Sequence, residues 1–148
     1  MTIAPPTTRS RPSGAKDGPA LPPEGLHALG ALGTEQLRAV LRRARDLLPL
    51  ANDPATNLGT LVGRVIATCF FESSTRTRIS FTLAAERLGA RVIDLGTSAS
   101  TSKGESIADT ARTLAAMGVS GFVVRSAQAG ASAIVARATG LPTINAGD

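Results

Sequence analysis

Residues 72–78 hold the densest group of side chains in the sequence that could bind an anion, and they read ESSTRTR. Four hydroxyls lie here with two guanidinium groups, from Ser73, Ser74, Thr75, Thr77, Arg76 and Arg78. An apolar run at 65–71 precedes the stretch and a helix pattern follows it, so we expect a junction between a strand and a helix. The first N–H groups of a helix lack internal partners, and the helix dipole is positive there. Together these donors predict an oxyanion site suited to phosphate.

A simpler interpretation of the same stretch is a serine-capped helix with two surface arginines. Ser and Thr caps are common, so one hydroxyl alone would carry no information. The number of hydroxyls and arginines in so few residues slightly favours anion binding, and the capping alternative stays open. The stretch lacks the glycines and lysine of a Walker loop, which argues against that mode of nucleotide binding.

Two further segments follow apolar runs and carry basic side chains. Residues 98–106 read SASTSKGES and contain Lys103, one of only two lysines among 16 basic residues. Arg125 comes directly after the apolar residues 121–124. Taken alone, the first segment is typical of a solvated loop, and an arginine at a strand end is unremarkable.

Apolar runs alternate with helix patterns from residue 64 onward. The runs lie at 65–71, 91–95, 121–124 and 142–145, and the helix patterns at 75–88, 106–117 and 131–139. Gly89, Gly118 and Gly140 follow the helices, where a left-handed cap favours glycine. We predict an α/β fold, with a parallel sheet of about four strands and flanking helices. Ligands bind beyond the carboxyl ends of such strands, which selects the segments after Phe71, Leu95, Val124 and Asn145.

An earlier helix is expected to begin at the cap Thr34 and to end at Pro49. Residues 1–24 are rich in Pro, Ser and Thr without apolar periodicity, so we predict a disordered tail there and one domain over 25–148. No apolar run reaches membrane-spanning length, and no secretory signal is present. We expect a cytoplasmic protein without a membrane partner.

Composition also bears on metals and nucleic acids as partners. Cys69 is the one cysteine, and with no second cysteine nearby we expect a small buried hydrophobe rather than a metal ligand. The net charge of +5 comes from arginines scattered along the chain, and Trp and Tyr are absent. Without a basic cluster or stacking aromatics, nucleic acid is not the expected partner.

Residues 74–78 resemble the phosphate-binding signature of the transcarbamylase family. The flanking FFE at 70–72, SF at 80–81 and LGA at 88–90 are also similar to that family. SKGES at 102–106, followed by ADT at 108–110, resembles the loop with which a transcarbamylase subunit reaches into its neighbour's active site. Lysine at 103 resembles the aspartate-specific members more than the ornithine-specific ones.

The resemblance implies roles for particular residues. Carbamoyl phosphate would be bound through Ser74, Thr75, Arg76, Thr77, Arg125 and Ser100, and aspartate through Lys103. Arg76 would neutralise the leaving phosphate, Arg78 would brace the site, and Arg125 would hydrogen-bond the carbonyl oxygen. Arg76, Thr77, Lys103 and Arg125 would be the catalytic side chains, and no metal or cofactor would be needed.

The implied reaction is carbamoyl transfer to L-aspartate in pyrimidine (UMP) biosynthesis, by a homotrimer with active sites shared between subunits. Association with further pyrimidine-pathway subunits stays open. The alternatives are an ornithine-type or other transcarbamylase, or a non-catalytic module that binds carbamoyl phosphate. The last residues, INAGD, resemble the family segment that leads to a loop with histidine and glutamine, and neither is present there. We therefore expect a truncated domain without the amino-acid-binding half and inactive by itself.

Overall fold

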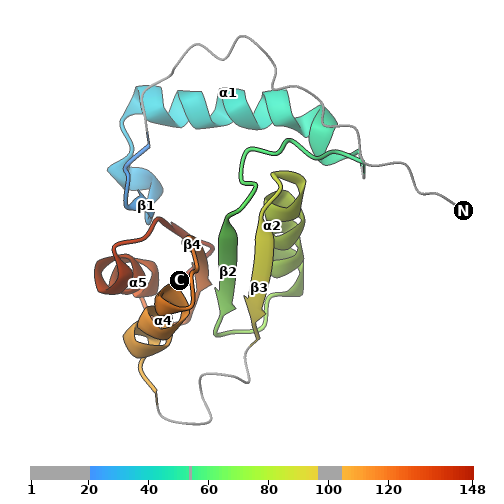
Figure 1. The fold of residues 1–148 in the computed structure, drawn as a ribbon. Coiled ribbons are helices and arrows are strands. Elements are labelled where there is room, and N and C mark those ends of the chain that lie inside the picture. Colours follow the sequence, from blue (N-terminus) through green and yellow to red (C-terminus); the bar gives the residue numbers. More distant parts are fainter. Residues whose placement is uncertain (1–20, 54, 97–104) are drawn as a thin grey trace, which may run out of the picture.

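Parallel strands and helices alternate along the chain in the computed structural model, which describes residues 21–53, 55–96 and 105–148. The strands form one sheet in the order β1-β5-β4-β2-β3 (Figure 1). The strands are β1 (Gly25–Leu26), β2 (Val65–Phe70), β3 (Arg91–Leu95), β4 (Gly121–Arg125) and β5 (Thr143–Asn145). The helices are η1 (Leu29–Ala31, a 3₁₀ turn), α1 (Thr34–Ala51), α2 (Thr75–Arg87), α4 (Ile107–Ala116) and α5 (Ala131–Thr139).

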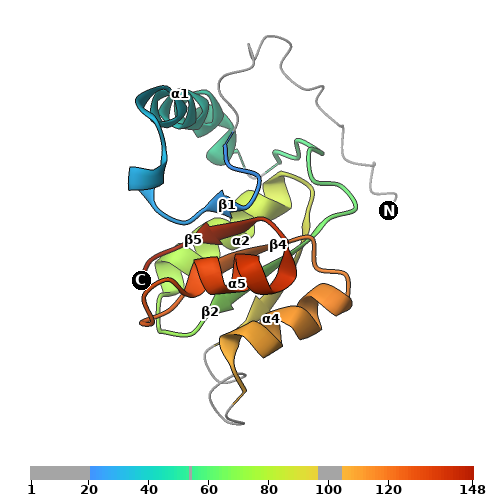
Figure 2. The same ribbon diagram turned by 90° about the vertical axis from the view of Figure 1, so that its left-hand side faces the viewer.

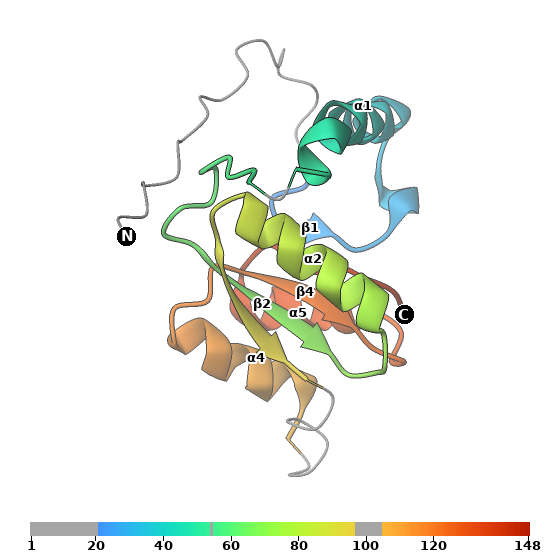
Figure 3. The same cartoon turned by 90° about the vertical axis from the view of Figure 1, so that its right-hand side faces the viewer.

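Helices cover both faces of the sheet. Helices α4 and α5 lie side by side on one face, which Figure 2 shows from the front. Helix α2 covers the opposite face and packs on β2 and β3 (Figure 3). Because every connection between neighbouring strands crosses over a face, all the strands point the same way and their carboxyl ends share one edge.

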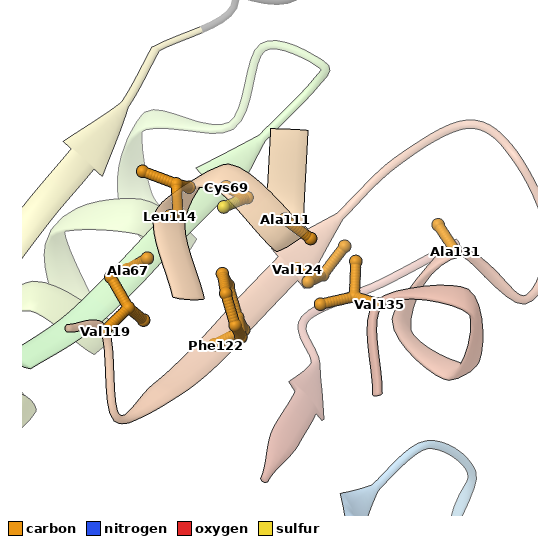
Figure 4. Close-up of a cluster of buried hydrophobic side chains, with 9 residues drawn as sticks. All are labelled: Ala67, Cys69, Ala111, Leu114, Val119, Phe122, Val124, Ala131 and Val135. Carbon is orange, nitrogen blue, oxygen red and sulfur yellow. The ribbon is translucent and has the colours of Figure 1, made fainter. Parts of the chain in front are cut away.

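The apolar core lies between the sheet and the helices α4 and α5 (Figure 4). Successive strand residues point to opposite faces, so Ala67 and Cys69 of β2 face this core together with Phe122 and Val124 of β4. Helices α4 and α5 supply the other wall, with Ala111, Leu114, Ala131 and Val135. The intervening residues Thr68 and Phe70 are also buried, so β2 is covered on both faces.

The predicted α/β fold is confirmed, with one strand more than expected. The four predicted strands are present within a residue or so of their predicted bounds. The additional strand, β1, pairs with the edge strand β5 over only two residues. Gly25 has φ 113°, and a Cβ atom there would lie 1.9 Å from the carbonyl oxygen of Thr143. A strand this short has no periodic pattern, so only the glycine marks it.

The helix ends agree with the sequence except in α1. Gly89, Gly118 and Gly140 have φ of 89°, 95° and 69°, which confirms the predicted left-handed positions. In α1, Pro49 does not end the helix, which continues to Ala51. Proline removes one donor, but the chain still closes a final turn, in which the amide of Asp53 donates to the carbonyl of Leu50 at 3.2 Å.

The predicted cap of α1 is also wrong by one residue. Thr34 is the first helical residue and Gly33 is the N-cap. The amide of Gly33 donates to Oε1 of Gln36 at 2.9 Å, so a side chain from the first turn reaches back to satisfy the exposed donor. Most of the predicted tail at 1–24 lies outside the described residues, and that boundary stays a prediction. No helix in the described ranges is long and apolar enough to cross a bilayer.

Cys69 is a buried hydrophobe, as expected, with 2% of its surface exposed. Burial, with a smaller contribution from the charge of Asp94, raises the pKa of its thiol to about 12. In the unfolded chain the thiol titrates near its ordinary pKa of about 8.5. At a pH between these two pKa values, the thiol is deprotonated in the unfolded chain and protonated in the folded chain.

Stability therefore falls as the pH rises above the unfolded pKa of the thiol. We expect the free energy of unfolding to drop between about pH 8 and about pH 10 by on the order of 1 kcal/mol more in the native sequence than in Cys69→Ala. Urea unfolding of both chains at both pH values measures the difference. An identical pH dependence in the two chains would contradict the burial of a protonated thiol.

Candidate functional site

A small hollow opens at the carboxyl edge of the sheet, where β2 ends and α2 begins. Its lining consists of Phe70, Glu72, Ser73, Ser74, Thr75 and Arg78. The volume of about 90 Å³ is far below the roughly 300–1,000 Å³ of pockets that take drug-sized ligands. The hollow therefore suits a small polar group, such as an oxyanion, better than a nucleotide.

Backbone donors surround the entrance to this hollow. The first intrahelical bond of α2 runs from the amide of Arg78 to the carbonyl of Ser74, at 3.1 Å. The amides from Ser74 to Thr77 precede it and have no intrahelical acceptor, because a helix leaves its first N–H groups unpaired. They carry the positive end of the helix dipole. An anion at this point would satisfy groups that the fold itself cannot.

The hydroxyl groups of this segment are not consumed in capping the helix. Ser74 is the N-cap residue of α2, yet its side chain makes no capping hydrogen bond. Within the described part of the chain, the hydroxyls of Ser73, Thr75 and Thr77 also have no hydrogen-bond partner. A serine thus stands at the N-cap, as the simpler alternative expects, but without the side-chain hydrogen bond of a cap. These hydroxyls are free to donate to a ligand.

The two arginines of the segment occupy different positions. Arg78 contributes to the lining, and its Nη1 donates to Oδ2 of Asp94 at 3.1 Å. Arg76 is exposed, does not line the hollow, and makes no ion pair or hydrogen bond with any described residue. Thr77 is also outside the lining. The structure thus brings Ser74, Thr75 and Arg78 together at the hollow, while Arg76 and Thr77 lie on the same helical turn outside its lining.

Arg125 lies beside the hollow, at the end of the neighbouring strand β4. It is the register partner of Phe70, one of the lining residues, because β2 and β4 pair in parallel. Its Nε donates to Oε1 of Glu72 at 2.6 Å, and its Nη1 donates to the carbonyl of Ala146 at 3.2 Å. The guanidinium is therefore held in place between the end of β2 and the segment after β5.

Glu72 is a site residue to which the sequence assigned no role. It lines the hollow and pairs with Arg125, 53 residues further along the chain. Its position directly after an apolar run that predicts a strand was the available signal, because such residues collect at the ligand edge. Its partner Arg125 could not be predicted, because the pairing depends on β2 lying beside β4, and no local sequence pattern encodes that strand order.

The remaining predicted site residues, Ser100 and Lys103, lie outside the described residues, so their roles stay predictions. Groups of three or more His, Cys, Asp or Glu that could hold a metal ion are absent from the described ranges. A larger hollow of about 330 Å³ lies between α1 and α2, bordered by residues such as Leu47, Leu83 and Leu88. Its lining is largely apolar and includes none of the predicted site residues.

Fold and site together describe an α/β domain with a candidate anion site at the first turn of a helix. Residues 26–148 match the family described as aspartate/ornithine carbamoyltransferase, carbamoyl-P binding domain. The chain belongs to this family, and the resemblance carried by residues 74–78 is confirmed.

Relatives and solved structures agree with this assignment. The chain is 46% identical over 127 residues to the aspartate carbamoyltransferase catalytic subunit of Solibacter usitatus, covering 85% of this chain and 42% of the relative. The catalytic subunit from Deinococcus radiodurans is also 46% identical, over 115 residues, which cover 77% of this chain and 37% of the relative. The chain thus spans about two fifths of the length of these relatives.

Solved structures of both branches of the family resemble this fold. The catalytic subunit of M. jannaschii aspartate transcarbamoylase has a TM-score of 0.73 at 36% identity, covering 84% of this chain and 41% of that one. Ornithine carbamoyltransferase from Thermus thermophilus also has a TM-score of 0.73, at 26% identity, covering 86% of this chain and 43% of that one. The fold is therefore common to both branches and does not separate them.

Removing the charge of Glu72 should strengthen anion binding. The carboxylate lines the hollow and occupies Arg125, so Glu72→Gln removes a repulsion and releases a cation. We expect inorganic phosphate to bind about threefold to tenfold more tightly to this variant, as measured by calorimetric titration. The matched control is Glu86→Gln, near the end of α2, which should leave the affinity unchanged. Weaker binding by Glu72→Gln would show instead that Glu72 holds Arg125 ready for the ligand.

Proposed function

We propose that this domain binds carbamoyl phosphate at the start of α2 and that the full-length protein transfers the carbamoyl group to L-aspartate. The products are N-carbamoyl-L-aspartate and phosphate, in pyrimidine biosynthesis. The observation that carries this proposal is the meeting of unpaired helix amides, free hydroxyls and the Arg78 guanidinium at one hollow, with Arg125 paired to its lining residue Glu72. That the domain belongs to the carbamoyltransferase family and that its relatives are named aspartate carbamoyltransferase support it.

The donors fit the two charges that develop in such a reaction. The uncharged amine of aspartate attacks the carbonyl carbon and a tetrahedral oxyanion forms. The C–O bond to phosphate then breaks, and the proton that the amine loses leaves with the phosphate. Arg125 polarises the carbonyl and stabilises that oxyanion, and the first turn of α2 with Arg76 stabilises the departing phosphate. The other contribution is orientation of the amine against the carbonyl. No metal or cofactor has a role in this scheme.

Assembly is part of the same proposal. Lys103, with Ser100, serves the active site of a neighbouring subunit and contacts both carbamoyl phosphate and aspartate, so the full-length protein is a homotrimer in the cytoplasm. What supports this is the resemblance of residues 102–110 to the family's shared loop. An ornithine-type enzyme is kept as the second candidate, because the structural likeness to ornithine carbamoyltransferase is as high as that to an aspartate enzyme.

Replacing Arg76 and Thr77 by alanine tests the phosphate site. Each lost hydrogen bond to a charged group costs about 1.5–3 kcal/mol, so the double variant should bind inorganic phosphate and carbamoyl phosphate at least roughly tenfold more weakly. Calorimetric titration of the 148-residue chain measures this. Arg42→Ala, an exposed arginine on α1, is the control and should bind as the native sequence does. Unchanged affinity in the double variant would place the phosphate site elsewhere.

Substrate choice is tested on the full-length protein with both amino acids. We expect carbamoylation of L-aspartate and no measurable turnover of L-ornithine, read as formation of the carbamoyl product. Turnover of ornithine alone would assign the protein to the other branch. Binding of carbamoyl phosphate without turnover of either amino acid would identify a non-catalytic binding module.

A further inference from the structure

A chain of polar contacts connects Arg78, which lines the small hollow, with the interior of the sheet. The carboxylate of Asp94, on β3, accepts from Nη1 of Arg78 through Oδ2 at 3.1 Å. Its other oxygen, Oδ1, accepts from the hydroxyl of Thr68 on β2 at 2.8 Å. The contacts therefore run from the interior of the sheet, through Asp94, to the guanidinium that lines the hollow.

Thr68 fixes the inner end of this chain. It is fully buried in β2, and it is the register partner of Asp94 in the parallel pairing of β2 with β3. Its neighbours Ala67 and Cys69 face the apolar core beneath α4, so Thr68 faces α2. A buried hydroxyl is costly unless it is hydrogen-bonded, and the Asp94 carboxylate is the partner that this one has. The bond therefore orients Asp94 as well as satisfying Thr68.

Arg78 is the outer and more exposed end of the chain of contacts. A long arginine side chain loses considerable rotamer entropy when it is fixed in one position. A carboxylate that already accepts a hydrogen bond from one of its nitrogens reduces the entropy that is lost when a ligand binds. A Cβ atom at Gly96, just after β3, would lie 3.9 Å from Nη1 of Arg78. The guanidinium thus sits at the carboxyl end of β3. Its other nitrogens have no hydrogen bond to any described residue.

We propose that Asp94, oriented by Thr68, is a positioning residue that holds Arg78 at the wall of the phosphate hollow. The proposal rests on the proposed function, because it concerns the same hollow. Asp94 itself is not among the lining residues. It acts on the ligand through Arg78, by fixing where the positive charge lies.

The charge of Asp94 complicates the obvious variant. Side-chain exposures of 37% for Arg78 and 42% for Asp94 mean that water screens the pair. Asp94→Asn would disturb the orientation of Arg78 and would also remove a repulsion toward the anion, and these effects oppose each other. Thr68→Val has neither problem, since it keeps the size of the side chain and every charge and deletes only the hydroxyl that orients Asp94.

The decisive experiment is a double-mutant cycle between Thr68→Val and Arg78→Ala, read as the dissociation constant of inorganic phosphate by calorimetric titration of the 148-residue chain. We expect Thr68→Val to bind phosphate about threefold to tenfold more weakly, the effect of losing one orienting hydrogen bond. In the Arg78→Ala background the same change should have almost no effect, because the guanidinium that it positions is gone. Urea unfolding monitors the fold of each variant.

The matched control is Thr143→Val on β5. Thr143 is as fully buried as Thr68, and its hydroxyl donates to the carbonyl of Leu141 rather than to a charged group. This variant should bind phosphate as the native sequence does. An equal loss in Thr143→Val would attribute the effect to general destabilisation and overturn the proposal.

The remaining outcomes also decide the question. Unchanged affinity in Thr68→Val, or a loss that persists in the Arg78→Ala background, would overturn the positioning role and leave the phosphate site intact. If the native chain binds neither inorganic phosphate nor carbamoyl phosphate, the proposed function fails and the positioning role fails with it. The affinity of the native chain thus separates the two failures.

Discussion

The unpaired amides at the start of α2 are the feature on which the site depends. A helix leaves its first N–H groups without acceptors wherever it begins, and most helices satisfy them with water or a capping side chain. Here the N-cap residue Ser74 does not turn its hydroxyl back onto the helix, and the turn opens onto a small hollow. The fold therefore leaves several donors unpaired beside one hollow.

The parallel sheet converts this local feature into a site. Because β2 lies between β3 and β4, segments that are distant in the sequence end at the same edge as the first turn of α2. Arg125 comes from β4 and Asp94 from β3, and each forms an ion pair with a residue next to the hollow. Two carboxylates thus hold two guanidinium groups around a region that an anion would fill. One of them, Glu72, competes with that anion, while Asp94 stands behind its arginine.

Local chemistry determined how much of this could be predicted from the sequence. Some signals span only a short stretch of sequence and can be recognised without knowing the fold. They are the strand and helix periodicities, the left-handed glycines and the cluster of hydroxyls at 73–77. The pairing of Glu72 with Arg125 and of Thr68 with Asp94 depends on strand order and register, which no local pattern encodes. Strand β1 was missed because it is defined only by a two-residue pairing with β5, and the passage of α1 through Pro49 was missed because the chain closes one more local turn after the proline.

The measurement that bears most directly on the central claim is a map of backbone amide chemical shifts during titration of the 148-residue chain with inorganic phosphate. The account predicts that the largest saturable shifts fall on residues 74–77, where the amides have no intrahelical acceptor. Arg125 and Asp94 should shift less, because the ligand reaches them through their neighbours. Saturable shifts confined to the apolar hollow between α1 and α2, or to residues away from the carboxyl edge of the sheet, would contradict this account.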